Sequence, residues 1–185
     1  MNKFQLTVLS LVFVLLSVTP SFAQDLNGYL EDARTAYQAG DNLAAFKNLR
    51  QAVFSVWDKI PLTVLDAELV TDQTSYTLKD DNVYNSGDNI YIVCQVVGYN
   101  IKEKDSLKNI NIASDFRVLD KEENVLMEKN DFASVDIDTP FPNTEFKMDF
   151  NYTLNAPPGK YILQTELRDQ NSDKTTEFNK TIVIE

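Results

Sequence analysis

The C-terminal stretch PPGKYILQTELRDQNSDKTTEFNKTIVIE, residues 157–185, decides the fold class of this chain. Its first half alternates between two faces with a period of two, as a half-buried β-strand does, and one face holds Tyr161, Leu163, Thr165 and Leu167. Residues 169–173 then interrupt the run with Asp, Asn and Ser, whose short side chains satisfy turn amides. A second extended segment follows. The stretch therefore predicts a β-hairpin that closes a two-sheet sandwich.

Segments of the same kind begin at residue 62. The clearest half-buried strand is 146–154, where apolar and polar residues alternate, while 90–97 is apolar on both faces, as in a central strand. Shorter runs predict strands at 62–70, 76–79, 110–118 and 125–129. The acidic stretch 80–89 and the charged stretch 102–109 are predicted as loops. Seven or eight strands at this spacing predict a mainly β fold, an immunoglobulin-like antiparallel β-sandwich over residues 62–185.

Residues 24–61 have a helical period instead. Apolar residues recur every three or four positions on both sides of a break at 40–42. Gly40 is suited to ending the first helix, Asp41 to capping the second, and Pro61 to stopping it. The sequence therefore predicts an N-terminal αα-hairpin before the sandwich.

This hairpin resembles a single tetratricopeptide unit, and the matching residues are Ala33, Gly40, Asp41, Ala45, Leu49 and Ala52. The resemblance covers the hairpin alone, and its closing proline stands at Pro61 rather than near Trp57. No second copy follows, so a peptide-binding solenoid is not expected. Two interpretations remain open. The hairpin covers an edge or end of the sandwich, or it is a docking surface that uses Tyr37 and Trp57.

Residues 1–23 have the parts of a secretory signal peptide. Lys3 precedes an apolar run at 6–18, and Ser21 and Ala23 are small residues of the kind that a signal peptidase accepts. The apolar run is short for a membrane span, and polar residues follow it without a basic flank. We therefore expect cleavage after Ala23, no membrane insertion after cleavage, and a periplasmic or extracellular location.

Composition excludes several functions. The chain has 28 acidic and 17 basic residues, a net charge of −11, so binding to nucleic acid or anionic lipid is not expected. It has no histidine, which removes the usual triads and most transition-metal sites, and its five glycines form no phosphate loop. Cys94 is the only cysteine, so no internal disulfide forms, and we expect it to be buried. These observations argue against an enzyme.

Three groups of residues are candidate sites. Asp80, Asp81 and Asp88 lie in the acidic loop 80–89 and offer the hard oxygen ligands that calcium prefers; no other cofactor is expected. A carbohydrate-binding surface would be formed by Tyr76, Tyr84, Tyr91 and Tyr99. A hydrolase would use paired carboxylates, and Asp136 and Asp138 would share one face if their segment is a strand.

The order of elements also resembles a group of uncharacterised exported bacterial proteins that pair a helical hairpin with a β-sandwich. The residues that carry the resemblance are Trp57 with Pro61-Leu62, 89–92 leading to Gly98-Tyr99, 116–120, and 157–161 through 167–172. It implies an envelope location and a fold, but no activity. The leading interpretation is a non-catalytic binding or assembly module that engages another envelope protein through an open sheet edge or the helical face. The alternative is a calcium- or carbohydrate-binding domain using loop 80–89.

Overall fold

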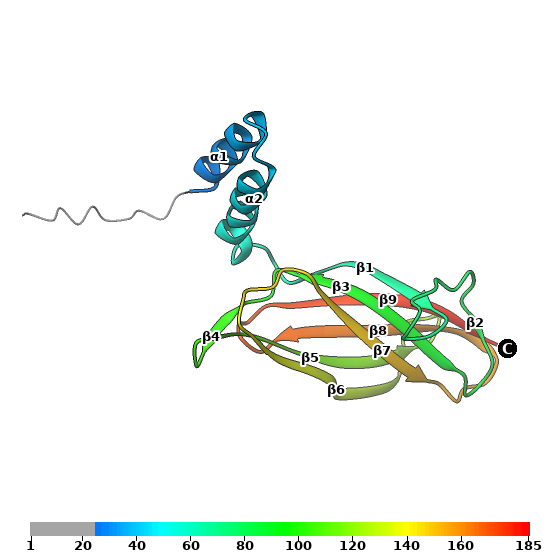
Figure 1. The fold of residues 1–185 in the computed structure, drawn as a ribbon. Coiled ribbons are helices and arrows are strands. Elements are labelled where there is room, and N and C mark those ends of the chain that lie inside the picture. The colour runs from blue at the N-terminus through cyan, green and yellow to red at the C-terminus, as the bar shows by residue number, and fades with distance from the viewer. Residues whose placement is uncertain (1–24) are drawn as a thin grey trace, which may run out of the picture.

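The computed structural model describes residues 25–185, so the predicted signal peptide lies outside the described residues. The described chain forms a helical hairpin followed by a β-sandwich (Figure 1). Helix α1 spans Leu26–Gln38 and helix α2 spans Asn42–Trp57. Asp25 and Asp41 cap them, because each carboxylate accepts a hydrogen bond of 2.9 Å from a backbone amide three residues later. Neither of these helices has the length and apolarity needed to cross a bilayer.

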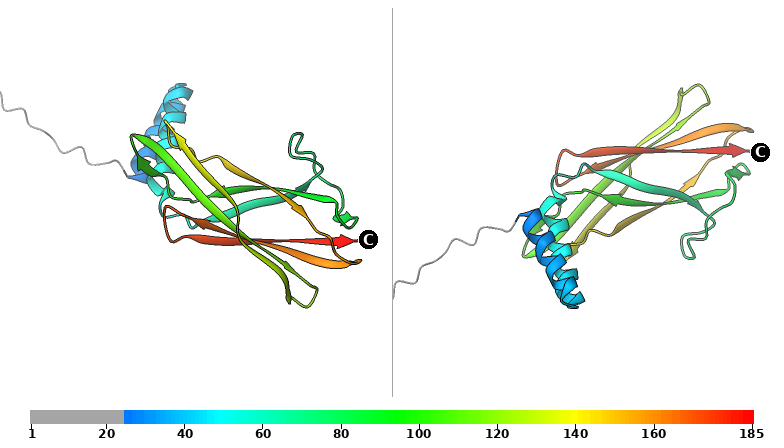
Figure 2. Two further views of the ribbon diagram at one scale, coloured as in Figure 1. Left: turned by 90° about the horizontal axis from the view of Figure 1, so that it is seen from below. Right: turned by 90° about the horizontal axis from the view of Figure 1, so that it is seen from above.

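The sandwich has two sheets (Figures 1 and 2). One sheet has the order β1-β3-β7, with β1 at Thr63–Val70, β3 at Asn89–Val97 and β7 at Phe146–Thr153. The six-stranded sheet has the order β2-β9-β8-β5-β4, and β6 pairs with the other edge of β5. Its strands are β2 (Val83–Tyr84), β4 (Lys102–Lys104), β5 (Leu107–Leu119), β6 (Val125–Thr139), β8 (Gly159–Asp169) and β9 (Thr175–Ile184). All pairings are antiparallel except that of β2 with β9. The predicted fold class is confirmed.

The core lies between the two sheets and follows the predicted alternation. In β7, every second side chain is buried, and Phe150 is 1% exposed. In β8, Leu163, Thr165 and Leu167 are fully buried, while Gln164 and Glu166 between them are half-buried. Cys94 of β3 is buried as expected, and burial raises the pKa of its thiol to about 12. That thiol therefore stays protonated and unreactive at neutral pH.

Three predicted boundaries were wrong. The segment 102–109 is not a loop, because Asp105 and Ser106 have φ values of 50° and 67° and form a two-residue turn between β4 and β5. Residues 125–139 form one continuous strand, in which Asp131 has φ 50° opposite a shift in register between Ser114 and Phe116. This β-bulge accommodates the extra residues of β6, so that its pairing with β5 resumes on the other side.

The third error concerns residues 76–84. A strand was predicted at 76–79 and a loop after it, whereas the structure forms only an isolated bridge between Leu78 and Val70. Tyr76 has a positive φ of 51°, which an extended strand does not tolerate. The paired segment is instead Val83–Tyr84, which lies parallel to the end of β9. The pairing partner, which is far away in sequence, decided this boundary.

The hairpin is joined to one end of the sandwich through the C-terminal part of α2 (Figure 1). The Trp57 indole nitrogen donates to the Tyr99 carbonyl oxygen at 2.8 Å, and the two rings meet edge to face with centroids 5.3 Å apart. The Lys174 ammonium donates to the carbonyl oxygens of Asp58, Ile60 and Gly98 at 3.1, 2.8 and 2.7 Å. Trp57 and Lys174 therefore hold the base of the hairpin on the sandwich.

Candidate functional site

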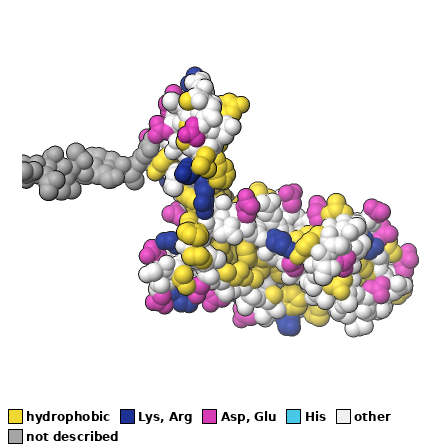
Figure 3. Space-filling view, viewed as in Figure 1, with side chains coloured by type: hydrophobic (Ala, Val, Ile, Leu, Met, Phe, Trp, Pro, Cys, Tyr) yellow, Lys and Arg dark blue, Asp and Glu magenta, His cyan; other side chains and the backbone are white. Residues whose placement is uncertain are grey.

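The face of α2 that does not contact α1 carries large apolar side chains in water. Leu43, Phe46, Arg50 and Val53 follow one another at spacings of three, four and three, which places them on one side of a helix. We call these four residues the α2 stripe. All four are exposed, and Phe46 is 62% exposed. Figure 3 shows apolar side chains gathered over the hairpin.

The small residues between the helices explain this exposure. Ala33 of α1 and Ala45 and Ala52 of α2 are buried, so the two helices approach closely through alanine. Large side chains on α2 therefore lie beside the helix–helix contact rather than inside it. Leu30 and Tyr37 of α1 are exposed as well, and Tyr37 is 71% exposed. The hairpin thus has more apolar surface than its own two helices bury.

Arg50 is the charged member of the α2 stripe. Its Nη2 donates to the Pro142 carbonyl oxygen at 3.2 Å, and its guanidinium carbon lies 5.4 Å from the centre of the Phe54 ring. The other three arginines each pair with at least one carboxylate; they are Arg34, Arg117 and Arg168. Among residues 25–185, Arg50 alone of the four has no ion pair with a carboxylate. Its guanidinium therefore has further N–H groups that can donate to a partner.

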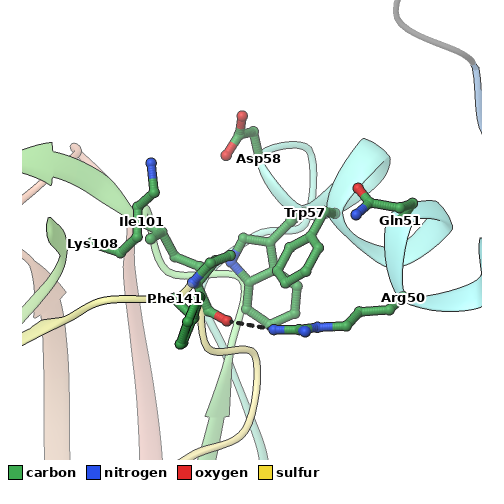
Figure 4. A pocket seen from close by; sticks show the side chains of 9 residues that line it. Arg50, Gln51, Trp57, Asp58, Ile101, Lys108 and Phe141 are labelled. Atoms are coloured by element: carbon green, nitrogen blue, oxygen red, sulfur yellow. Dashed lines mark hydrogen bonds between the residues drawn. The ribbon is translucent and has the colours of Figure 1, made fainter. Parts of the chain in front are cut away.

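The stripe leads into a cleft at the base of the hairpin (Figure 4). The cleft has a volume of about 400 Å³, with Arg50, Phe54 and Trp57 on the side of α2. Ile101, Lys108 and Phe141 come from the end of the sandwich. Asp58 also lines the cleft. Lys108 is paired with Glu103 at 2.8 Å, and Arg50 is the cation of the lining that forms no ion pair with a carboxylate of the described chain. The arrangement suits an apolar segment that carries negative charge.

The two predicted partner-binding residues, Tyr37 and Trp57, differ in their exposure to solvent. Tyr37 lies at the far end of α1 and is exposed, as a docking residue must be. Trp57 is only 5% exposed, and its indole is used in the junction with Tyr99. The structure does not bring the two residues together, and Trp57 is a wall of the cleft rather than an exposed anchor.

Phe46, Leu43 and Arg50 were missed as site residues. The signal for them was the width of the apolar arc on α2, which is larger than one neighbouring helix can cover. A wide arc also fits a helix that is buried on two sides, so periodicity alone did not distinguish the two cases. The position of the sandwich distinguishes them: it contacts α2 at Arg50 and at the C-terminal end, whereas Leu43 and Phe46 remain exposed.

The three predicted calcium ligands do not converge. Asp81 binds the Lys79 ammonium, which lowers the pKa of its carboxyl group, and it lines one hollow together with Asp80. Asp88 lines a different hollow. There it accepts hydrogen bonds from the backbone and side-chain amides of Asn85 at 2.8 and 3.0 Å, which lower the pKa of its carboxyl group. Over residues 25–185 no group of three or more acidic residues or cysteines is placed to hold a metal ion.

The other two candidate groups have structural roles. Tyr84 and Tyr99 are buried and Tyr76 is exposed, so the four tyrosines do not form one exposed surface for carbohydrate. Asp136 and Asp138 do share a face of β6, as predicted. Their carboxylates accept hydrogen bonds of 2.6 and 2.8 Å from the buried Asn109 amide, which ties β6 to β5.

Comparisons with known proteins identify no family and give low structural similarities. No protein-family model and no curated protein matches the chain. A PKD domain of an M14-like peptidase from a Thermoplasmatales archaeon is 9% identical, with a TM-score of 0.39 over 68% of this chain and 96% of that chain. A Niemann-Pick type C2 protein from the Japanese carpenter ant is 11% identical, with a TM-score of 0.40 over 68% of this chain and 94% of that one. Activity and ligand do not follow from such similarities.

Proposed function

We propose that this protein is a non-catalytic, exported binding or assembly module that engages another envelope protein through the apolar face of its helical hairpin. The observation that carries the proposal is the exposure of Leu43, Phe46 and Val53 along one side of α2. Burying such side chains against a partner would contribute about 25 cal/mol for each Å² of apolar surface removed from water. The resemblance to exported bacterial proteins supports the location.

The free edge of β6 is another surface that a partner could use, and its charged side chains favour the hairpin over it. β6 carries charged side chains along much of its length, at Glu128, Lys129, Asp131, Asp136 and Asp138. Charges on an edge strand discourage pairing with the strand of another chain. The edge is therefore protected, whereas α2 is not.

Photo-crosslinking in the native envelope tests the proposal. A photoreactive residue replaces Phe46 of the α2 stripe in one variant and Leu126 of β6 in the other; both side chains are apolar and more than half exposed. We expect one protein to be captured reproducibly from position 46 and not from position 126. That protein is then purified, and its affinity for the wild type and for Phe46→Ser is compared.

The result that supports the proposal is a weaker affinity of the Phe46→Ser variant, by about tenfold for a buried aromatic contact. Equal capture from both positions would mean that exposed apolar residues react without specificity, and the proposal would fail. It would also fail if position 46 captured nothing.

A further inference from the structure

We propose that the α2 stripe binds an amphipathic helix of the partner and selects one that carries an acidic residue within its apolar stripe, opposite Arg50. The inference rests on the proposed function and names the chemistry of the partner. Three features support it: the spacing of the stripe, the free donors of Arg50 and the charge of α2.

The spacing of the stripe is that of a helix–helix seam. Leu43, Phe46, Arg50 and Val53 occupy alternate steps of three and four residues, and Trp57 continues the series to the base of the hairpin. This is the repeat by which one helix packs side by side against another. A β-strand would meet such residues with the wrong period, so a helix is the occupant that fits.

Arg50 gives the seam its selectivity. A guanidinium has five N–H donors, and in the described chain Arg50 uses Nη2 on the Pro142 carbonyl oxygen. A purely apolar partner helix would cover the remaining donors and leave them without acceptors, which is unfavourable. A carboxylate opposite Arg50 would accept from the guanidinium through two parallel hydrogen bonds.

The charge of α2 points the same way. The helix contains Lys47 and Arg50 and no acidic residue, although the chain as a whole has 28 acidic residues against 17 basic ones. The sandwich, residues 61–185, holds 23 of those acidic residues and 12 of the basic ones. Helix α2 itself therefore carries two positive charges between its acidic caps Asp41 and Asp58, and an acidic segment is attracted to the middle of the helix.

A second copy of this chain does not meet these requirements. The α2 stripe contains no acidic residue, and neither does the row Leu26, Leu30, Ala33 and Tyr37 on α1. Pairing two α2 stripes would leave both Arg50 side chains without a carboxylate, and in the parallel register the two guanidinium groups would lie opposite each other. The partner is therefore a different polypeptide.

Three synthetic helical peptides test the inference on the mature protein. Each has 21 residues with leucine at the seam positions, and only the central seam residue differs: Glu, Gln or Lys. The peptides lack tryptophan, so binding is followed through the fluorescence of Trp57, which is the only tryptophan and a wall of the cleft. We expect the Glu peptide to bind about five- to tenfold more tightly than the Gln peptide, and the Lys peptide to bind most weakly.

Variants of Arg50 make the test specific. In Arg50→Glu the order of the peptides should reverse, and in Arg50→Gln the Glu and Gln peptides should bind alike. Arg34→Glu is the matched control, because it changes the charge of the hairpin equally but lies on α1, paired with Glu31 at 3.5 Å. Thermal unfolding of each variant shows whether the hairpin remains folded.

Several outcomes would overturn the inference. Equal binding of the three peptides to the wild type would show an apolar surface without selection for charge. If Arg34→Glu and Arg50→Glu lower the affinity for the Glu peptide equally, the preference comes from the overall charge of the hairpin and not from a specific ion pair with Arg50. If none of the three peptides binds the wild type, the helical partner is excluded. It is also excluded if the wild-type protein forms dimers with itself and the Phe46→Ser variant does not. Capture from position 46 in the envelope is independent of these results, so failure here and failure of the proposed function are distinguishable.

Discussion

Phe46 of α2 and Phe150 of β7 are the same residue in opposite surroundings. Phe150 is 1% exposed and stacks beside Tyr152, with ring centroids 5.9 Å apart, between the sheets. Phe46 is 62% exposed on the outer side of the hairpin. The sandwich buries its large apolar side chains within the chain, whereas the hairpin displays several of its own. An aromatic residue that folding does not use is available for a partner.

The two regions also differ in charge. Residues 25–60 carry five acidic and four basic residues, while residues 61–185 carry 23 and 12. The charges of the sandwich are organised into pairs, such as Arg168 with Asp115 at 2.9 Å and with Asp131 at 2.6 Å. In the hairpin, Arg50 lacks a carboxylate. The sandwich is therefore strongly acidic, whereas the hairpin is nearly neutral.

Truncation of the two phenylalanines should give the largest contrast. We expect Phe150→Ala to lower the free energy of unfolding by about 4 kcal/mol, because it leaves a cavity in the core. Phe46→Ala should change it by less than about 0.5 kcal/mol, since the side chain is exposed. Urea unfolding of both variants measures the difference. Equal losses would show that the α2 stripe is part of the core.

Two glycines compare the junction with the tip of the hairpin. Gly98 and Gly40 have similar φ values, 75° and 79°, but a Cβ on Gly98 would lie 2.2 Å from the Pro61 carbonyl oxygen. Nothing lies within 4 Å of the Cβ position on Gly40. Gly98→Ala should therefore cost about 3 kcal/mol or more, and Gly40→Ala about 1 kcal/mol. Thermal unfolding of the pair, with Trp57 fluorescence to report the junction, tests this expectation.

The ion pair between β5 and β8 predicts a dependence on pH. Burial alone would raise the pKa of Asp115, but hydrogen bonds from Arg168 and from the Asp131 amide outweigh it and hold the pKa below its ordinary value. A depressed folded pKa stabilises the protein above the unfolded pKa of about 3.9, and this stability is lost as the pH falls through the folded pKa. Asp115→Asn should cost about 2 kcal/mol at pH 7 and distinctly less at pH 3. Urea unfolding at both pH values measures this. A difference in the free energy of unfolding between wild type and Asp115→Asn that is the same at pH 7 and pH 3 would contradict this account.

The smallest expected effect concerns calcium. Because Asp80 and Asp81 line one hollow and Asp88 another, we expect millimolar calcium to leave the melting temperature unchanged. The double variant Asp80→Ala with Asp88→Ala serves as the control. A rise in melting temperature of several degrees in the wild type, absent from the double variant, would restore the hypothesis of a calcium site in the loop 80–89.

Local patterns predicted much of the fold but little of the site. Strand β7 and the hairpin of β8 and β9 followed from alternation, and the two helices from their period and from Gly40 and Asp41. The pairing of Val83–Tyr84 with β9 could not be predicted, since it depends on a strand about 100 residues later. The role of Trp57 in the junction could not be predicted for the same reason, because its hydrogen-bond acceptor, the carbonyl oxygen of Tyr99, lies 42 residues later.

The sequence by itself determined that the chain has two regions, because periods of 3.6 and 2 cannot form the same element, and that one region is a sandwich. Its lack of histidine excludes sites that depend on an imidazole, such as the Ser-His-Asp triad. The tertiary structure alone decided that α2 keeps Leu43 and Phe46 in solvent with Arg50 among them. The reason is physical: burial depends on what lies opposite a side chain. The contacts of α2 with the sandwich lie at Arg50 and at the C-terminal end of the helix, and Leu43 and Phe46 in its first half remain uncovered.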